Sequence, residues 1–308
     1  MLRSLYSGVS GMRSNQTKMD VLGNNIANVN TTGFKSGRVR FQDMLSQTLT
    51  GAQSPTATTL GGVNAQQVGL GVKIGAIDTV MTDGALQPTN RDLDLAIEGT
   101  GFFVLSQDTN AVQKLYTRDG AFYRDYQGNM VNAGGYRVVG YKPAAYGQEI
   151  DQANLPAMET LDIPNKIDVA RVDAAGDPVL DINGDPVMDT LDLQTFSIDG
   201  SGKITGVFSD GKSYTLGQLA VAKFENSEGL EKVGSSNYRA SNNSGAPDEQ
   251  VANTKGFGII RQGVLEMSNV DLANEFTELI VTSRSYQANS RTITTSDEML
   301  QELINLKR

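Results

Sequence analysis

The sequence predicts an α+β protein: the N- and C-terminal helices pair as a coiled-coil layer, and a discontinuous all-β domain of sandwich- or barrel-like type lies between them. Two observations support this. The first and last segments of the 308-residue chain place apolar residues at alternating three- and four-residue steps. From residue 75 the apolar period changes to two, in short runs that Gly-rich turns separate. A short irregular insert is expected to interrupt the β-domain.

The first predicted helix spans residues 2–29 and is about 42 Å long at 1.5 Å per residue. Its glycines at positions 8, 11 and 23 each destabilise it by about 1 kcal/mol relative to alanine. We therefore expect this helix to be marginal by itself and to be ordered by packing. Its three-four row consists of Leu2, Leu5, Val9, Met12, Gln16, Met19, Gly23 and Ile26.

The last predicted helix spans residues 271–306 and is about 54 Å long. Ser268 and Asp271 fit a capping box at its start. A helix of this length needs a partner, which is either the first helix in an intramolecular hairpin or further copies of the chain. Its expected seam is Leu272, Phe276, Leu279, Ser283, Tyr286, Ser290, Ile293, Asp297 and Leu300, with a second apolar row at Ile280, Met299, Leu303 and Ile304.

An asparagine-rich block, residues 24–35, follows the first helix. Asparagine near a helix C-terminus tolerates left-handed backbone and ends a helix well. The block is either a switch from helix to extended chain that contacts neighbouring subunits, or a plain helix stop with a polar loop. Residues 34–74 follow as an irregular connector, with a short helix expected at residues 41–49.

The period-two segments divide into residues 75–145 and 196–267, which together form the expected β-domain. Residues 146–195 are acidic and poorly patterned, and they form the expected insert. The insert contains an eight-residue repeat at 173–188. Asp181, Asn183 and Asp185 have the first spacing of a calcium loop, but Pro186 stands where that loop needs glycine. A calcium-stabilised surface adhesin is therefore a minor alternative.

Composition excludes several classes of function. Cysteine and histidine are both absent, which removes disulfides, thiolate chemistry, the usual general base and the commonest zinc ligand. The net charge of −9 argues against nucleic acid and anionic membrane surfaces as partners. No apolar run is long enough for a transmembrane helix, and we expect no cleaved signal peptide. Asp92, Asp94 and Glu98 leave a carboxylate-based hydrolase as a second minor alternative.

Both ends of the chain resemble the bacterial flagellar rod and hook family. The N-terminal signature is LYSGVSGMRSNQTKMDVLGNNIANVNTTGFK, and the C-terminal one is SNVDLANEFTELIVTSRSYQANSRTITTSDEMLQELINLKR. A match at both termini, in order, is more specific than one short motif. RDLDLAIEGTGFFVL, YTRDGAFYRDYQGNMVNAGGYRVVGY and FSIDGSGKITGVFSDGKSYTLGQLAVAKF resemble central parts of the same family.

The resemblance implies a structural, non-enzymatic subunit without cofactors or metals. In the first interpretation, copies form the flexible tubular hook, which transmits torque from rod to filament and encloses the export channel. In the alternative, they form the straight, rigid distal rod. Residues 1–33 and 268–308 become the assembly domain, and the insert becomes a reduced outer domain. The implied assembly residues are Leu2, Leu5, Val9, Met12, Met19, Ile26, Asn24, Asn25, Asn28, Thr32, Gly33, Phe34, Phe276, Leu279, Ile280, Tyr286, Ile293, Leu300 and Leu303.

The resemblance also implies partners and a location. The first partner is the chain itself, in a helical homopolymer. The others are the distal rod protein, the hook cap protein, the hook–filament junction protein and the flagellar type III export apparatus. The implied location is extracellular, in the flagellar hook or basal body, reached without a cleaved signal peptide and without membrane insertion.

Overall fold

The computed structural model describes residues 2–55, 61–108, 111–143, 146–148, 150, 155–170, 188–254 and 256–306. The chain forms two compact units. The helical unit consists of Met1–Val29, Lys35–Val80 and Val270–Arg308, and the β unit of Asn30–Phe34 and Met81–Asn269. The backbone passes between the two units after residues 29, 34, 80 and 269, which makes four crossings.

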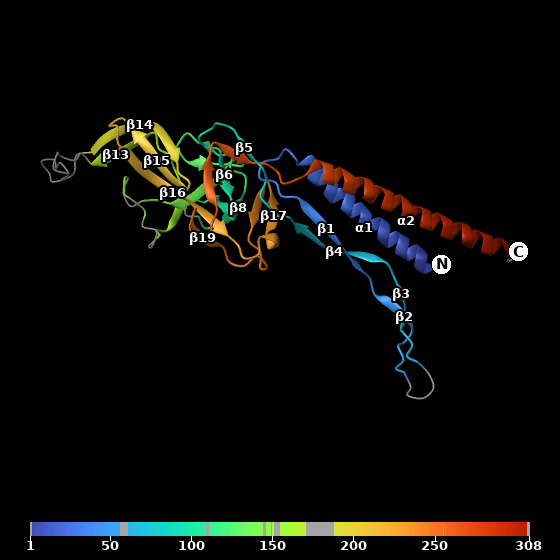
Figure 1. Cartoon of the computed structure of the whole chain (residues 1–308). Helices are drawn as coiled ribbons and strands as arrows, with labels where there is room; N and C mark the ends of the chain where they lie inside the picture. The colour runs from blue at the N-terminus through green and yellow to red at the C-terminus, as the bar shows by residue number, and fades with distance from the viewer. Residues whose placement is uncertain are drawn as a thin grey trace. The chain divides into compact units, whose positions relative to one another are not determined.

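Two long helices, α1 (Leu2–Ala27) and α2 (Leu272–Leu306), lie side by side in opposite directions in the helical unit (Figure 1). Ser4 Oγ and Ser296 Oγ are 3.4 Å apart near one end of the pair, and Lys18 Nζ lies 2.5 Å from Glu278 Oε2 further along. The predicted terminal helices and their pairing are thus confirmed. The antiparallel orientation, which the sequence left open, follows from these contacts.

The two helices touch through small and polar residues. Gly8 and Gly11 are buried: a Cβ at Gly11 would lie 2.7 Å from Asn289 Nδ2, and one at Gly8 would lie 3.1 Å from Ile293 Cγ1. The α1 contact face therefore lies one residue before the apolar row that the sequence predicted as the seam. The spacing of apolar residues does not reveal this face, because glycine and serine allow the two backbones to approach closely but contribute no large apolar side chain.

Four strands complete the helical unit: β1 (Gly37–Asp43), β2 (Ser46–Thr50), β3 (Gln66–Gly69) and β4 (Val72–Thr79). β1 pairs with β4, and β2 pairs with β3, both antiparallel. The helix expected at residues 41–49 is wrong, because these residues belong to β1 and β2 and the bend between them. Alternation of Arg38 and Arg40 with Val39 and Phe41 is the period-two signal that favours the strand.

The β unit is built around one antiparallel sheet with the path β13-β14-β15-β16-β11-β7-β8-β18-β17. Smaller pairs, β20–β6 and β21–β5, are joined separately. A short 3-10 helix, η1, covers Ser227–Gly229. The strands are β5 (Leu86–Pro88), β6 (Leu95–Glu98), β7 (Phe102–Ser106), β8 (Lys114–Thr117), β9 (Tyr123–Arg124), β10 (Met130–Val131), β11 (Arg137–Tyr141), β12 (Met158–Thr160), β13 (Lys166–Ala170), β14 (Met188–Ile198), β15 (Lys203–Phe208), β16 (Ser213–Lys223), β17 (Glu231–Gly234), β18 (Asn237–Arg239), β19 (Asp248–Val251), β20 (Ile259–Gln262) and β21 (Val264–Glu266).

The central strands of this sheet are covered on both faces. In β7, Phe103 belongs to one buried cluster and Phe102 to the other, because successive side chains of a strand point to opposite faces. Strand β16 divides in the same way, with Leu219 in the first cluster and Ala220 in the second. Burial on both faces explains why these strands read as continuous apolar runs. The predicted α+β class is confirmed.

The acidic segment 146–195 contains strands β12 and β13 and the start of β14. Apart from Met188, the repeat at 173–188 lies outside the described residues, so the calcium alternative is not tested there. Elsewhere, in the part of the chain that the structure describes, no three acidic side chains gather as a metal site. Within the same part, no helix is long and apolar enough to span a membrane.

We expect valine at Gly11 to destabilise the helix pair relative to valine at Gly23. Valine has the same intrinsic helix propensity at both positions, but a Cβ at Gly23 meets nothing within 4 Å, whereas one at Gly11 enters the contact with Asn289. Overpacking of this kind destabilises by about 1–3 kcal/mol. Unfolding of the two variants, followed by far-ultraviolet circular dichroism, measures the difference. Equal stability would show that the close approach does not hold the helices together.

Candidate assembly surface

The helical unit exposes large apolar side chains on α2. Phe276 is 50% exposed, Ile280 60% and Ile304 64%. Met299, Leu303 and Leu306 are exposed as well. Apolar side chains that gather on one element in this way mark an interaction surface. This outer face of α2, together with its C-terminal end, is the first part of the candidate assembly surface.

The predicted assembly residues of the two helices occupy different environments. Those of α1 flank the contact face and are half-buried; they are Leu5, Val9, Met12, Met19 and Ile26. On α2, Leu279, Ile293 and Leu300 are half-buried, whereas Phe276, Ile280, Tyr286 and Leu303 are exposed. The side chain of Leu2 is not described. The exposed set is therefore available to other copies, and the half-buried set is available only in part.

A groove of about 520 Å³ lies between α1 and the strands of the helical unit. Its shape is fixed by backbone contacts: Val72 N–H donates to Ser10 Oγ (3.3 Å), and Met44 N–H donates to the carbonyl of Gly71 (2.8 Å). Most of its lining is apolar, with an arginine at each end of the α1 segment. The lining residues are Arg3, Tyr6, Val9, Ser10, Arg13, Ser14, Met44, Leu70 and Val72.

Asn25 holds three elements of the helical unit together. Its Nδ2 donates to the Gly37 carbonyl and its Oδ1 accepts the Gly37 N–H, each at 2.9 Å, so the side chain pairs with β1 as a strand would. The same Nδ2 lies 3.2 Å from each carboxylate oxygen of Glu275 on α2. Asn28 instead donates to the carbonyl and Oδ1 of Asn24, which closes the end of α1. Asn25 is therefore committed to contacts within its own chain.

Residues 30–34 of the asparagine-rich block belong to the β unit. Thr32 Oγ1 donates to Asp119 Oδ1 at 2.8 Å, and Gly33 N–H donates to the Glu266 carbonyl at 2.8 Å. Gly33 has φ +65°, and a Cβ there would lie 2.6 Å from the Asp119 nitrogen, so only glycine fits. Burial raises the pKa of the Asp119 carboxyl, although the Thr32 hydroxyl acts in the opposite direction. Whether Thr32, Gly33 and Phe34 also contact other copies stays a prediction.

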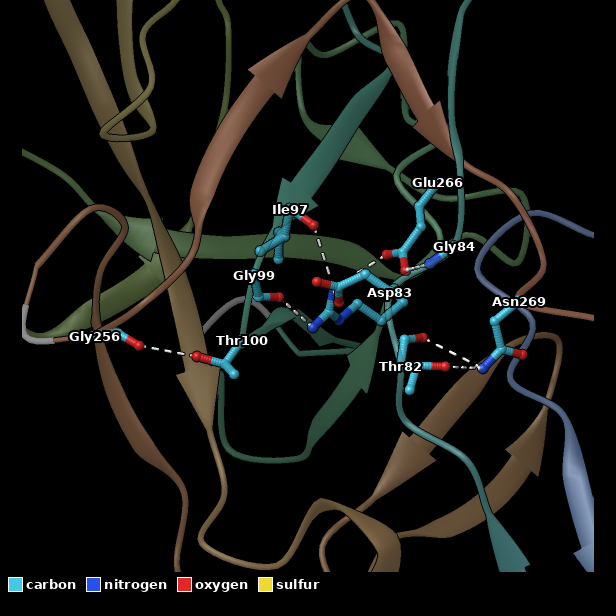
Figure 2. A network of polar contacts seen from close by, with 10 residues as sticks. Thr82, Asp83, Gly84, Ile97, Gly99, Thr100, Gly256, Glu266 and Asn269 are labelled. Carbon is cyan, nitrogen blue, oxygen red and sulfur yellow. Dashed lines mark hydrogen bonds and ion pairs between the residues drawn. The ribbon is translucent and has the colours of Figure 1, made fainter.

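Glu266, three residues before the β-unit boundary at Asn269, is buried and lies in a polar network (Figure 2). Its Oε2 accepts from Arg118 Nη1 at 3.1 Å, and its Oε1 accepts from the Gly84 N–H at 3.0 Å. Arg118 also donates to the carbonyls of Gly99 (2.7 Å) and Ile97 (3.3 Å). The network thus joins the beginning and the end of the segment Met81–Asn269, which forms most of the β unit. Sequence reasoning missed it, because nothing in the local pattern relates Arg118 to Glu266.

The three carboxylates of the hydrolase alternative are separately engaged. Asp94 is buried and lies 3.4 Å from the Arg91 guanidinium. Glu98 is exposed and pairs with Arg261 at 2.7 Å. Asp92 is exposed, and its backbone carbonyl accepts a hydrogen bond from Gln262. The structure does not bring a pair of these side chains together for acid–base chemistry.

Three protein-family models match the chain. "Flagella basal body rod protein" matches residues 5–35, "Flagellar hook protein FlgE/F/G D1 domain" residues 96–206, and "Flagellar basal body rod FlgEFG protein C-terminal" residues 261–306. The first covers α1 from residue 5 onward, the second lies in the β unit, and the third contains α2.

Curated relatives match over the whole chain. The flagellar basal-body rod protein FlgG of Bacillus subtilis is 45% identical over 309 residues, covering 100% of both proteins. The flagellar hook protein FlgE of Borreliella burgdorferi is 34% identical over an alignment of 445 residues that also covers 100% of both. The rod protein FlgG of the same organism is 33% identical over 310 residues, again with 100% coverage of both.

We expect Glu266→Ala to destabilise the β unit by about 3–5 kcal/mol, because it leaves the buried Arg118 guanidinium without its carboxylate. Glu98→Ala is the matched control: it removes an exposed ion pair with Arg261, which contributes about 0–1 kcal/mol. Denaturant unfolding of both variants measures the effect. Equal midpoints would show that the buried pair does not stabilise the unit.

Proposed function

Because the chain belongs to the flagellar basal body rod and hook family, we propose that it is a subunit of the distal rod, which assembles into a straight, rigid tube. The family is structural and not enzymatic. The observation that carries the choice of the rod is the 45% identity to a rod protein of matching length. This proposal takes up the alternative of the sequence analysis in preference to the hook.

The hook is the second candidate, and one observation favours it. The flagellar hook protein FlgE of Helicobacter mustelae is 53% identical, but over 141 residues that cover 46% of this chain and 31% of that protein. Alignments with two other hook proteins extend to 445 and 467 residues, against 310 for a rod protein. This chain therefore lacks a counterpart for a large part of those hook proteins, which weighs toward the rod.

The division of the chain supports a mechanical role. The β unit closes its two apolar clusters within one chain, whereas the helical unit leaves apolar residues of α2 exposed. In the proposed polymer, helical units form the inner tube around the export channel and β units form the outer layer. A contact between two different surfaces of the same chain repeats without closing and so builds an open helical polymer.

The proposed partners follow from this placement. The first is the chain itself, and the others are neighbouring rod and hook components, including the hook cap and hook–filament junction proteins if the chain is a hook subunit. The flagellar type III export apparatus would deliver the chain to the growing end.

Electron microscopy of polymers grown from purified protein tests the choice between rod and hook. We expect straight tubes that stay straight over their whole length. Tubes with smooth, variable curvature would reject the rod in favour of the hook, and a chain that forms no tubes would reject both.

We expect Ile280→Asp to abolish tube formation while the β unit keeps its stability. Ile280 is 60% exposed and points away from α1, so a charge there leaves the helix pair intact but disfavours burial against another copy. Ile280→Val, which keeps an apolar side chain, should still form tubes. Sedimentation of polymer and thermal unfolding of both variants give the two readouts. Normal yields of tubes from the Ile280→Asp variant would remove this face from the assembly surface.

A further inference from the structure

The C-terminal end of α2 extends past the start of α1. The contact of Ser4 with Ser296 fixes the register of the antiparallel pair, so residues 299–306 have no α1 residue beside them in the part of the chain that the structure describes. These eight residues span about 12 Å. We call residues 299–306 the overhang.

The overhang is the most apolar part of the face that α2 turns toward α1. Along the covered length, this face consists mainly of polar or small residues, among them Glu275, Thr282, Asn289 and Ser296. Beyond Ser296, steps of four and then three residues along the same face of α2 lead to Leu300 and Leu303. Ile304 lies beside them. Leu303 and Ile304 are 50% and 64% exposed. The leucine-rich part of this α2 face therefore lies beyond the first residues of α1.

The groove beside α1 has complementary chemistry. Tyr6, Val9 and Met44 give it an apolar lining, and its walls are held by the Ser10 and Gly71 contacts described above. Arg3 and Arg13 border it, and neither forms an ion pair among the described residues.

We propose that the overhang of one copy occupies this groove on a second copy, displaced along the axis of the helix pair. The occupant is a second copy because the overhang continues the α1–α2 interface and the family assembles with itself. The overhang and the groove are different surfaces of one chain, so each copy offers a free overhang to the next and the contact propagates. This inference rests on the proposed function and names the surface through which the copies join.

Disulfide cross-linking tests the contact, because the natural chain contains no cysteine. Two single-cysteine variants, Met44→Cys in the groove and Leu303→Cys in the overhang, are mixed, polymerised and oxidised. We expect a covalent dimer that contains one of each variant. The matched control replaces Leu303→Cys by Asn305→Cys, which is also exposed but lies about 200° round the helix from Leu303.

Several-fold more dimer from the Leu303 variant than from the Asn305 variant supports the contact. Equal yields from the two, or none from either, in polymers of normal appearance would overturn it and leave the proposed function standing. Failure of the natural chain to polymerise would remove the proposed function, and this inference with it. Because Met44 and Leu303 stand in separate molecules, a dimer of the mixed variants reports only on contact between copies.

Discussion

The close approach of α1 and α2 is the constraint on which the rest of the helical unit depends. Gly8 and Gly11 place the backbone of α1 directly against Asn289 and Ile293 of α2. Small and polar residues therefore fill most of the contact that apolar residues fill in an ordinary coiled coil, with Ile293 and the buried Leu22 as apolar exceptions. The larger apolar side chains are left beside the contact or outside it, as Ile280 shows. The pair is thus ordered within one chain and still incomplete on its outer surface.

The sequence predicted the helices well and their contact face poorly. A three-four rhythm over more than twenty residues fixes the existence of α1 and α2, but the rhythm follows Leu5 and Val9, whereas the contact follows Gly8 and Gly11. Two strands within residues 34–74, β2 and β3, were missed because they are exposed throughout and carry no apolar alternation. Strand β1 was missed although its period-two alternation is present in the sequence. Arg118 and Glu266 are 148 residues apart in the sequence, so no local pattern relates them.

The two units treat their polar groups differently. In the β unit, the Arg118 guanidinium and the Glu266 carboxylate are buried together. Glu266 also accepts a hydrogen bond from Gly84, so the network connects the beginning and the end of the segment Met81–Asn269. In the helical unit, the ion pair of Lys18 with Glu278 is partly exposed and adds little to stability. Asn25 is the exception there, since it is buried and binds both β1 and α2. The β unit is thus stable by its own contacts, and the helical unit has most to gain from neighbours.

The four crossings of the backbone between the units have a mechanical consequence. A domain tethered by one linker swivels about it, and all the tension passes through a single strand of polypeptide. Here a pull or a twist is shared among four parallel covalent connections, so no one of them bears the whole strain. Cleavage of the backbone at any one of these connections would still leave the two units joined through the other three.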